Sequence, residues 1–137
     1  MKLEINNTTK TKINNKLLQQ AADVFGRKMK LKEKEVSLAL VSAGRIKEFN
    51  RKYRGLDKVT DVLSFAGDGP GDFLGEILIY YPQIKRQAKA SGIKIEDELV
   101  FIFVHGLLHL VGYDDQSESG REKMLKIGRE LCRQLRG

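Results

Sequence analysis

Residues 96–115 read EDELVFIFVHGLLHLVGYDD, and this stretch contains both histidines of the 137-residue chain. Three acidic residues open it, and an apolar run then continues to Gly112. Carboxylates are favoured at the positive N-terminal end of a helix, and glycine commonly follows the last helical turn. The stretch is therefore predicted to form an apolar helix from Glu96 to about Val111.

The two histidines of this helix, His105 and His109, have the spacing of metal ligands. Four residues complete nearly one helical turn, so both imidazoles project from the same face. Gly112 allows the chain to reverse, which can bring Asp114 or Asp115 towards the pair. Two imidazoles, a carboxylate and a place for water are typical of a catalytic zinc site. The pair alone is a weak signal, because such spacing also occurs by chance.

The residue that follows His105 bears on the choice of reaction. Metalloproteases with the HExxH motif place a glutamate there as general base, whereas this chain has Gly106. A zinc peptidase is therefore the less favoured alternative.

Outward from this helix, hydrophobic periodicity predicts alternating strands and helices. Strands are expected over residues 2–6, 35–41, 60–66 and 73–80, and helices over residues 12–28, 43–53, 82–91 and 120–135. Ser42 is expected to cap the second of these helices, and Ser119 with Glu122 to form a capping box before the last one. The expected fold is a single α+β domain over residues 1–137. About four strands form a mixed sheet, and about five helices, including a zincin-like metal helix, pack with it.

Composition and charge limit the partners. The net charge is +7, which favours polyanions such as RNA, because their binding releases counterions. A single cysteine, Cys132, excludes an internal disulfide and a cysteine-based zinc finger. The longest strongly apolar run, residues 99–104, is too short to span a membrane, and the N-terminus has no signal core. A cytoplasmic protein with no membrane partner is expected.

Three blocks of sequence resemble the YbeY family of bacterial endoribonucleases. Residues 105–115 agree with ten of the eleven positions in that family's H-G-x-L-H-L-x-G-Y-D-H signature. NRKYRG at 50–55, followed by Asp57 and by TDVLSF at 60–65, is similar to a second block, and LGEI at 74–77 to a third. The blocks occur in the family's order and span about half of the chain.

The resemblance implies a compact α+β metal-dependent hydrolase that cleaves single-stranded RNA in ribosomal RNA maturation and ribosome biogenesis. It implies one zinc ion held by His105, His109 and position 115, and an arginine of the cleft at Arg54. Ribosomal RNA, ribosomal proteins and an assembly GTPase are the partners that it suggests.

The chain departs from the family pattern at two positions. Val59 replaces a proline that stiffens the chain before the strand at 60–66. Asp115 replaces the third histidine, and aspartate is itself a legitimate zinc ligand. Its charge would reduce the net charge of a zinc site from about +2 to about +1. Water in the site should then be less acidified, phosphate less strongly attracted, and harder ions such as manganese better able to compete. Zinc is the expected ion, with manganese or nickel as alternatives.

Several roles have two readings at this stage. Arg54 either stabilises charge on a phosphate or is a solvated member of the basic cluster at 51–58. Asp61 either orients a metal ligand or faces solvent, and Tyr113 is expected to pack over the helix end. Few aromatic residues are expected at the surface, so base stacking is not predicted. The functional alternative is a non-catalytic RNA- or ribosome-binding assembly factor with a weak or structural metal site.

Overall fold

The structure is a computed structural model that describes the backbone of residues 1–136 and the side chains of residues 1–135. The strands are β1 (Lys2–Asn7), β2 (Glu35–Leu40), β3 (Val62–Ala66) and β4 (Phe73–Ile79). The helices are α1 (Asn15–Lys28), α2 (Ala43–Arg54), α3 (Tyr81–Ser91), α4 (Ile95–Leu110) and α5 (Glu118–Arg136). The predicted α+β class and order of elements are confirmed.

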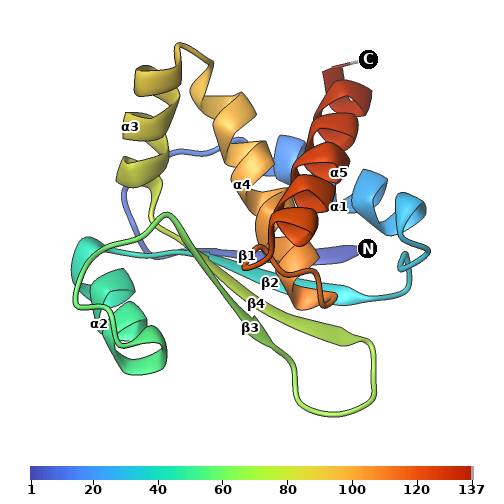
Figure 1. The fold of residues 1–137 in the computed structure, drawn as a ribbon, viewed down its shortest axis with the longest axis horizontal. Coiled ribbons are helices and arrows are strands. Elements are labelled where there is room, and N and C mark those ends of the chain that lie inside the picture. The colour runs from blue at the N-terminus through green and yellow to red at the C-terminus, as the bar shows by residue number, and fades with distance from the viewer. Residues whose placement is uncertain (137) are drawn as a thin grey trace.

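The strands form one mixed sheet in the order β1-β2-β4-β3. β1, β2 and β4 are parallel to one another, whereas β3 pairs antiparallel with β4 at the edge. The loop at residues 67–72, which contains the GDGPG turn signal, joins β3 to β4 at one end of the molecule (Figure 1).

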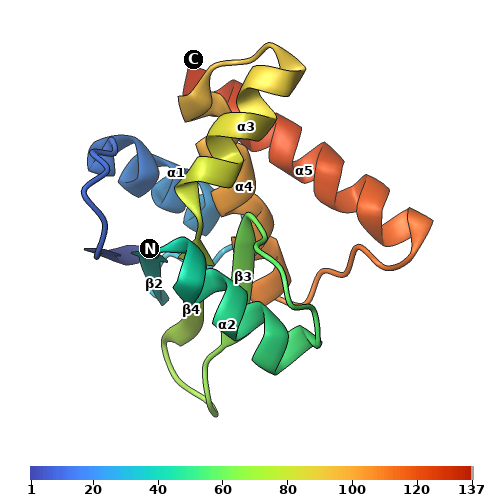
Figure 2. The same ribbon diagram turned by 90° about the vertical axis from the view of Figure 1, so that its left-hand side faces the viewer.

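Helices cover both faces of the sheet, but unequally. α1, α3, α4 and α5 lie on one face, and α2 lies on the other (Figures 1 and 2). Alternate residues of β2 point to opposite sides, as the period of a strand requires. Val36, Leu38 and Leu40 belong to the main core under the four helices. Ala39 belongs to a smaller core under α2.

α4 is the central helix of the larger layer. It contacts α1, α3, α5 and the strands β3 and β4. Its residues Leu99, Phe103, Leu107 and Leu108 are at most 2% exposed. A helix surrounded in this way is apolar on nearly every side, which explains the long apolar run in the sequence. None of the described helices is long and apolar enough to cross a membrane.

Most predicted boundaries are correct within three residues, and the differences have local causes. Ser42 caps α2 as predicted, since its Oγ accepts a hydrogen bond from the backbone N–H of Arg45 at 3.3 Å. The prediction of a capping box at Ser119 is wrong. α5 begins at Glu118, two residues before the predicted start at 120, and Ser117 Oγ accepts from the backbone N–H of Gly120 at 2.9 Å.

Candidate metal centre

The chain reverses directly after α4. Gly112 has a φ of +97°, a backbone conformation that a side chain disfavours. The backbone N–H of Tyr113 then donates to the carbonyl of Leu108, which closes the helix end at 3.0 Å. Tyr113 packs against the main core, in agreement with its predicted place over the helix end. The reversal carries the following residues back alongside the face of α4 that bears the histidines.

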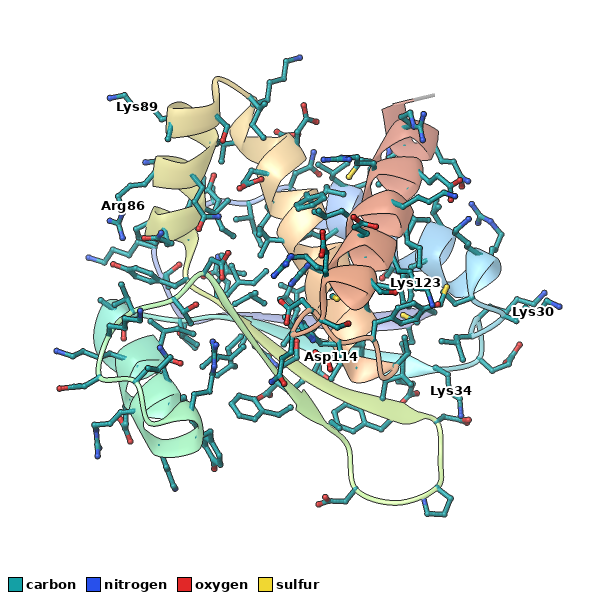
Figure 3. All side chains as sticks on the ribbon, viewed as in Figure 1. Lys30, Lys34, Arg86, Lys89, Asp114 and Lys123 are labelled. Carbon is teal, nitrogen blue, oxygen red and sulfur yellow. The ribbon has the colours of Figure 1, made fainter. Side chains whose placement is uncertain are left out.

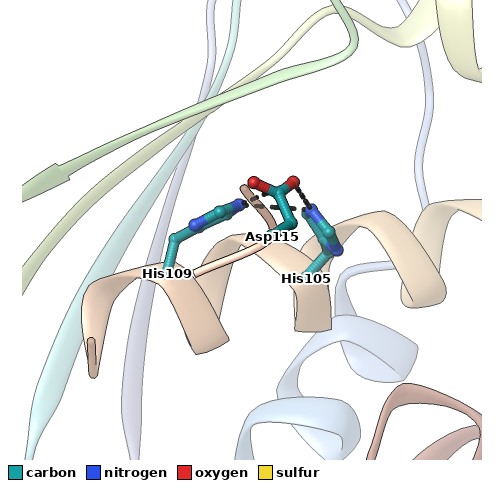
Figure 4. A group of neighbouring side chains, drawn as sticks. All are labelled: His105, His109 and Asp115. Carbon is teal, nitrogen blue, oxygen red and sulfur yellow. Dashed lines mark hydrogen bonds and ion pairs between the residues drawn. The ribbon is translucent and has the colours of Figure 1, made fainter. Parts of the chain in front are cut away.

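His105, His109 and Asp115 converge at this point (Figure 4). The two Nε2 atoms lie 3.2 Å apart. Asp115 Oδ2 lies 3.4 Å from Nε2 of His105 and 3.6 Å from Nε2 of His109. All three side chains are half-buried, so they face both the protein and the solvent.

These separations fit a tetrahedral divalent cation. Donor atoms at about 2.0–2.1 Å from a zinc ion, with tetrahedral angles, lie about 3.3 Å from one another. The three observed separations of 3.2, 3.4 and 3.6 Å bracket that value. Three protein donors leave a fourth position open, which is the pattern of a catalytic rather than a structural site. The donor set and its spacing therefore suit zinc, with His105, His109 and Asp115 as the residues that would hold it.

The protonation state of His105 also suits a ligand. Its burial lowers the pKa of the imidazole, and the nearby His109 lowers it further, while Asp115 and Asp61 oppose the shift. A lowered pKa favours the neutral imidazole, whose lone pair can bind a metal.

Asp114 is not part of the cluster, although the sequence left it open as an alternative to Asp115. It is exposed on the connection between α4 and α5 (Figure 3). Its Oδ1 accepts a hydrogen bond from the backbone N–H of Gln116 at 2.6 Å, so it stabilises the turn itself.

A cleft of about 790 Å³ opens beside the three side chains. Its volume lies in the range of about 300–1,000 Å³ that is usual for ligand sites. Its walls come from the end of α2, from β3 and the residues before it, from α4, and from the start of α5. The lining residues are Tyr53, Arg54, Thr60, Asp61, Val62, Leu63, Ser64, Phe65, Phe101, Ile102, His105, His109, Asp115, Gln116 and Leu125.

Arg54 lies in the wall of this same cleft, at the last position of α2. It is exposed, and no hydrogen bond or ion pair joins it to another residue of the described chain. Its guanidinium group is therefore available to an anion that enters the cleft.

Asp61 also lines the cleft, and neither of its two predicted roles describes it fully. It is half-buried, and its Oδ2 accepts from Nε2 of Gln87 at 3.3 Å. The same Gln87 nitrogen donates to Oε2 of Glu98 at 3.1 Å, which ties the chain before β3 to α3 and α4. Asp61 contributes a negative charge near His105 rather than a hydrogen bond to it. Sequence periodicity did not identify Gln87, because nothing along the chain places it beside Asp61.

Gly106 is explained by the packing of α4 on the sheet. A Cβ atom at this position would lie 3.1 Å from Cγ2 of Ile77 and 3.2 Å from Oγ of Ser64. Ser64 Oγ donates to the carbonyl of Gly106 at 3.0 Å, so β3 and α4 are in close contact here. A glutamate would face the sheet instead of the cleft, and the space for its side chain is already filled.

The aromatic surface of the cleft differs from the sequence prediction. Helical spacing in the sequence places Tyr53 on the same side of α2 as Ile46 and Phe49. Ile46 is fully buried, but Tyr53 is 56% exposed and, with Phe65, lines the cleft. Few aromatic residues of the described chain are exposed, as expected, but one of them, Tyr53, lies in the cleft. The one indication in the sequence that Tyr53 lines the cleft is its position directly before Arg54.

Taken together, these observations define an α+β protein whose central helix carries a histidine pair that could hold a metal with Asp115, at the edge of a cleft that Arg54 also lines. A profile of the family described as Endoribonuclease YbeY matches residues 2–136. The chain belongs to this family.

Individual relatives agree with the family profile. An Endoribonuclease YbeY of Limosilactobacillus reuteri is 36% identical over 151 residues, covering 96% of this chain and 95% of the relative. An Endoribonuclease YbeY of Desulfitobacterium hafniense is 47% identical over 114 residues, covering 75% of this chain and 73% of the relative. The solution structure of TM1509 from Thermotoga maritima is similar with a TM-score of 0.67 and 31% identity, covering 98% of this chain and 91% of that one.

Proposed function

We propose that this chain is a metal-dependent endoribonuclease that cleaves single-stranded RNA during ribosomal RNA maturation. The observation that carries the proposal is the convergence of His105, His109 and Asp115 at zinc-ligand spacing beside the unpaired Arg54. The protein would work in the cytoplasm on ribosome assembly, where ribosomal proteins and an assembly GTPase are candidate partners.

Each of these residues has a defined task in the proposal. His105, His109 and Asp115 would hold one divalent cation, zinc by preference and manganese or nickel as competitors. When bound, this cation would supply Lewis-acid chemistry towards a phosphate and increase the acidity of water. Arg54 would donate two hydrogen bonds to phosphate oxygens and so offset the negative charge that builds at phosphorus. The net charge of +7 favours the approach of a polyanion.

Peptide hydrolysis is less well supported by the same geometry. The backbone at Gly106 lies too close to Ile77 and Ser64 for the glutamate that peptidases of the HExxH type use. No such steric argument applies to phosphodiester cleavage, for which an open cation position and Arg54 suffice.

The test combines metal analysis with RNA cleavage. The purified protein should contain about one zinc equivalent, as one three-residue site implies. It should cleave a single-stranded oligoribonucleotide, lose this activity on chelation and regain it with zinc. His105→Ala should lower both the metal content and the rate, the latter by a hundredfold or more, since the charge stabilisation by a metal is about several kcal/mol.

Two outcomes contradict the proposal. Cleavage that survives both chelation and His105→Ala would indicate a contaminating nuclease. RNA binding without any metal-dependent cleavage would instead identify a non-catalytic assembly factor that binds RNA. Asp115 makes this alternative more credible than a third histidine at the same position would.

A further inference from the structure

Three aromatic rings form a connected cluster between α2 and the edge strand β3. Phe49 and Tyr53, one helical turn apart, have nearly parallel rings with an interplanar angle of 10° and centroids 5.9 Å apart. Phe65 of β3 meets the Tyr53 ring at an angle of 65° and a centroid distance of 5.0 Å. Phe49 and Phe65 therefore contact the Tyr53 ring from two sides, and Nζ of Lys52 lies 5.4 Å from its centroid.

The Tyr53 ring is nevertheless not buried by these contacts. It is 56% exposed, and Leu56, Phe73 and Ile93 are the other large apolar residues of the described chain with exposed side chains. Tyr53 is the one of these four that lines the cleft with Arg54 and the three candidate metal ligands. An aromatic ring that is held rigidly and left open to solvent loses little conformational freedom when a flat ligand covers it.

We propose that Tyr53, supported by Phe49 and Phe65, is a stacking platform for an unpaired nucleobase of the RNA that the cleft binds. This inference rests on the proposed endoribonuclease function and names the residue that positions the substrate. Arg54 is the next residue along the chain, so one end of α2 presents a ring for a base and a guanidinium group for a phosphate. These are the two groups that every nucleotide of a single strand offers.

The platform also accounts for a preference between kinds of RNA. A base in a duplex is paired and stacked between its neighbours, so its face cannot reach Tyr53. A base in a single strand can turn out and stack on an aromatic ring, whichever of the four bases it is. Tyr53 should therefore select for unpaired nucleotides and discriminate little among sequences.

The first experiment measures the binding of a short oligouridylate by fluorescence anisotropy, in chelator to prevent cleavage, and the cleavage kinetics of the zinc-loaded protein. Tyr53→Ala should weaken binding about tenfold and raise KM with little change in kcat, since removal of a stacking ring costs about 5- to 150-fold in affinity. Tyr53→Phe keeps the ring and should bind as the wild type does. Phe73→Ala is the matched control, because Phe73 is 49% exposed but does not line the cleft.

The second experiment uses the absence of tryptophan from the sequence. Tyr53→Trp introduces a single tryptophan, whose emission should be quenched by oligouridylate but not by its duplex with oligoadenylate. Phe73→Trp should respond to neither RNA. Equal quenching by duplex and single strand would overturn the selectivity.

The outcome separates this inference from the proposed function. If the wild type cleaves RNA in a metal-dependent manner while Tyr53→Ala binds oligouridylate as tightly as the wild type, the platform is wrong and the nuclease assignment stands. If the wild type neither binds nor cleaves RNA, the proposed function fails, and the platform fails with it.

Discussion

Asp115 differs from the other two candidate ligands in charge. Burial lowers the pKa of His105 and so favours its neutral imidazole, whereas a carboxylate adds one negative charge directly to the site. The aspartate side chain is also shorter than imidazole, so the loop after Gly112 must approach the helix closely. The structure shows this approach, with Oδ2 of Asp115 within 3.6 Å of both Nε2 atoms.

The Asp115→His variant should have a higher ratio of zinc to manganese affinity than the wild type, by about tenfold, because carboxylate suits the harder ion. The larger net charge of its site should also move the pH dependence of cleavage to lower pH. Calorimetry with each metal and a pH series of rates measure these effects. Asp114→His, at the exposed neighbour, is the control, and tighter zinc binding by the wild type than by Asp115→His would contradict the prediction.

Arg54 acts on the substrate rather than on the metal in our proposal. Arg54→Ala should therefore lower kcat/KM by about a hundredfold while leaving the metal content unchanged. Arg54→Lys, which keeps the charge without the fork of donors, should give an intermediate rate. Arg51→Ala, one helical turn earlier and outside the cleft lining, should be close to wild type. Unaltered cleavage by Arg54→Ala would show that Arg54 has no role in the reaction.

At the scale of elements, the position of the metal helix depends on how closely α4 approaches the sheet. The Ser64 hydrogen bond to the carbonyl of Gly106 and the contact of that glycine with Ile77 set this distance. His105 precedes the contact and His109 follows it by less than one turn. A displacement of α4 here would move both imidazoles relative to Asp115, which is on a different segment.

Gly106→Ala should lower the free energy of unfolding by about 1–3 kcal/mol, because the added methyl group overpacks the contact with Ile77. The loss should occur although alanine favours a helix over glycine by about 1 kcal/mol. Denaturant unfolding measures the difference.

Two further variants check the cause. Gly44→Ala in α2, where no atom lies within 4 Å of the added Cβ, should be neutral or stabilising. Ile77→Val combined with Gly106→Ala should recover part of the loss, since it removes the methyl group that lies 3.2 Å from the added Cβ. A Gly106→Ala variant at least as stable as the wild type would contradict the packing argument.

At the scale of the whole molecule, the candidate metal site joins α4 to the connection that follows it. Two ligands lie on α4, and the third lies on the connection to α5. A cation that binds only the folded chain stabilises it by mass action.

Zinc at a thousandfold excess over its dissociation constant should raise the stability by about 4 kcal/mol, and a chelator should remove this gain. Thermal unfolding followed by circular dichroism, with zinc and with chelator, measures the shift in Tm. His105→Ala should show the same Tm in both conditions. A zinc-dependent rise in Tm that persists in this variant would place the cation elsewhere.

The distribution of positive charge predicts where RNA extends beyond the cleft. Basic side chains project from several elements, including α3, α5 and the segment between α1 and β2 (Figure 3). A groove along α5 is lined by Lys126, Arg129 and Arg133 and shares Leu125 with the cleft. We therefore expect the phosphates of a strand that leaves the cleft to follow this groove.

Substitution of Lys126, Arg129 and Arg133 by glutamine should weaken RNA binding and reduce its dependence on salt. Each lost phosphate contact should lower the slope of log affinity against log salt by about 0.7 for a single strand. Glutamine at Arg27, Lys30 and Lys32 removes the same charge from a different depression and is the matched control. Equal slopes of log affinity against log salt for the two triple variants would show that RNA does not bind preferentially along the α5 groove.

The order of the elements and the histidine pair follow from the sequence alone. Both depend on interactions over a few residues: the period of apolar side chains, the capping of helix ends and the turn at Gly112. Each of these features is contained in a short segment of the sequence. The α+β class, most boundaries and the helix that carries the histidine pair were therefore predictable. The start of α5 was not, because Ser117 and Ser119 are equivalent as caps until the path of the loop is known.

The residues after Gly112 left Asp114 and Asp115 as alternatives, and the family resemblance alone indicated position 115. The Gln87 link to Asp61 and the exposure of Tyr53 were decided only by the tertiary structure. Each depends on contacts between segments that are distant in the sequence, or on which way a short loop turns. The apolar pattern of α2 placed Tyr53 with Ile46, but Ile46 is fully buried and Tyr53 is 56% exposed. Whether a residue lines a cleft is set by what packs around it, and periodicity along one helix contains no information about its neighbours.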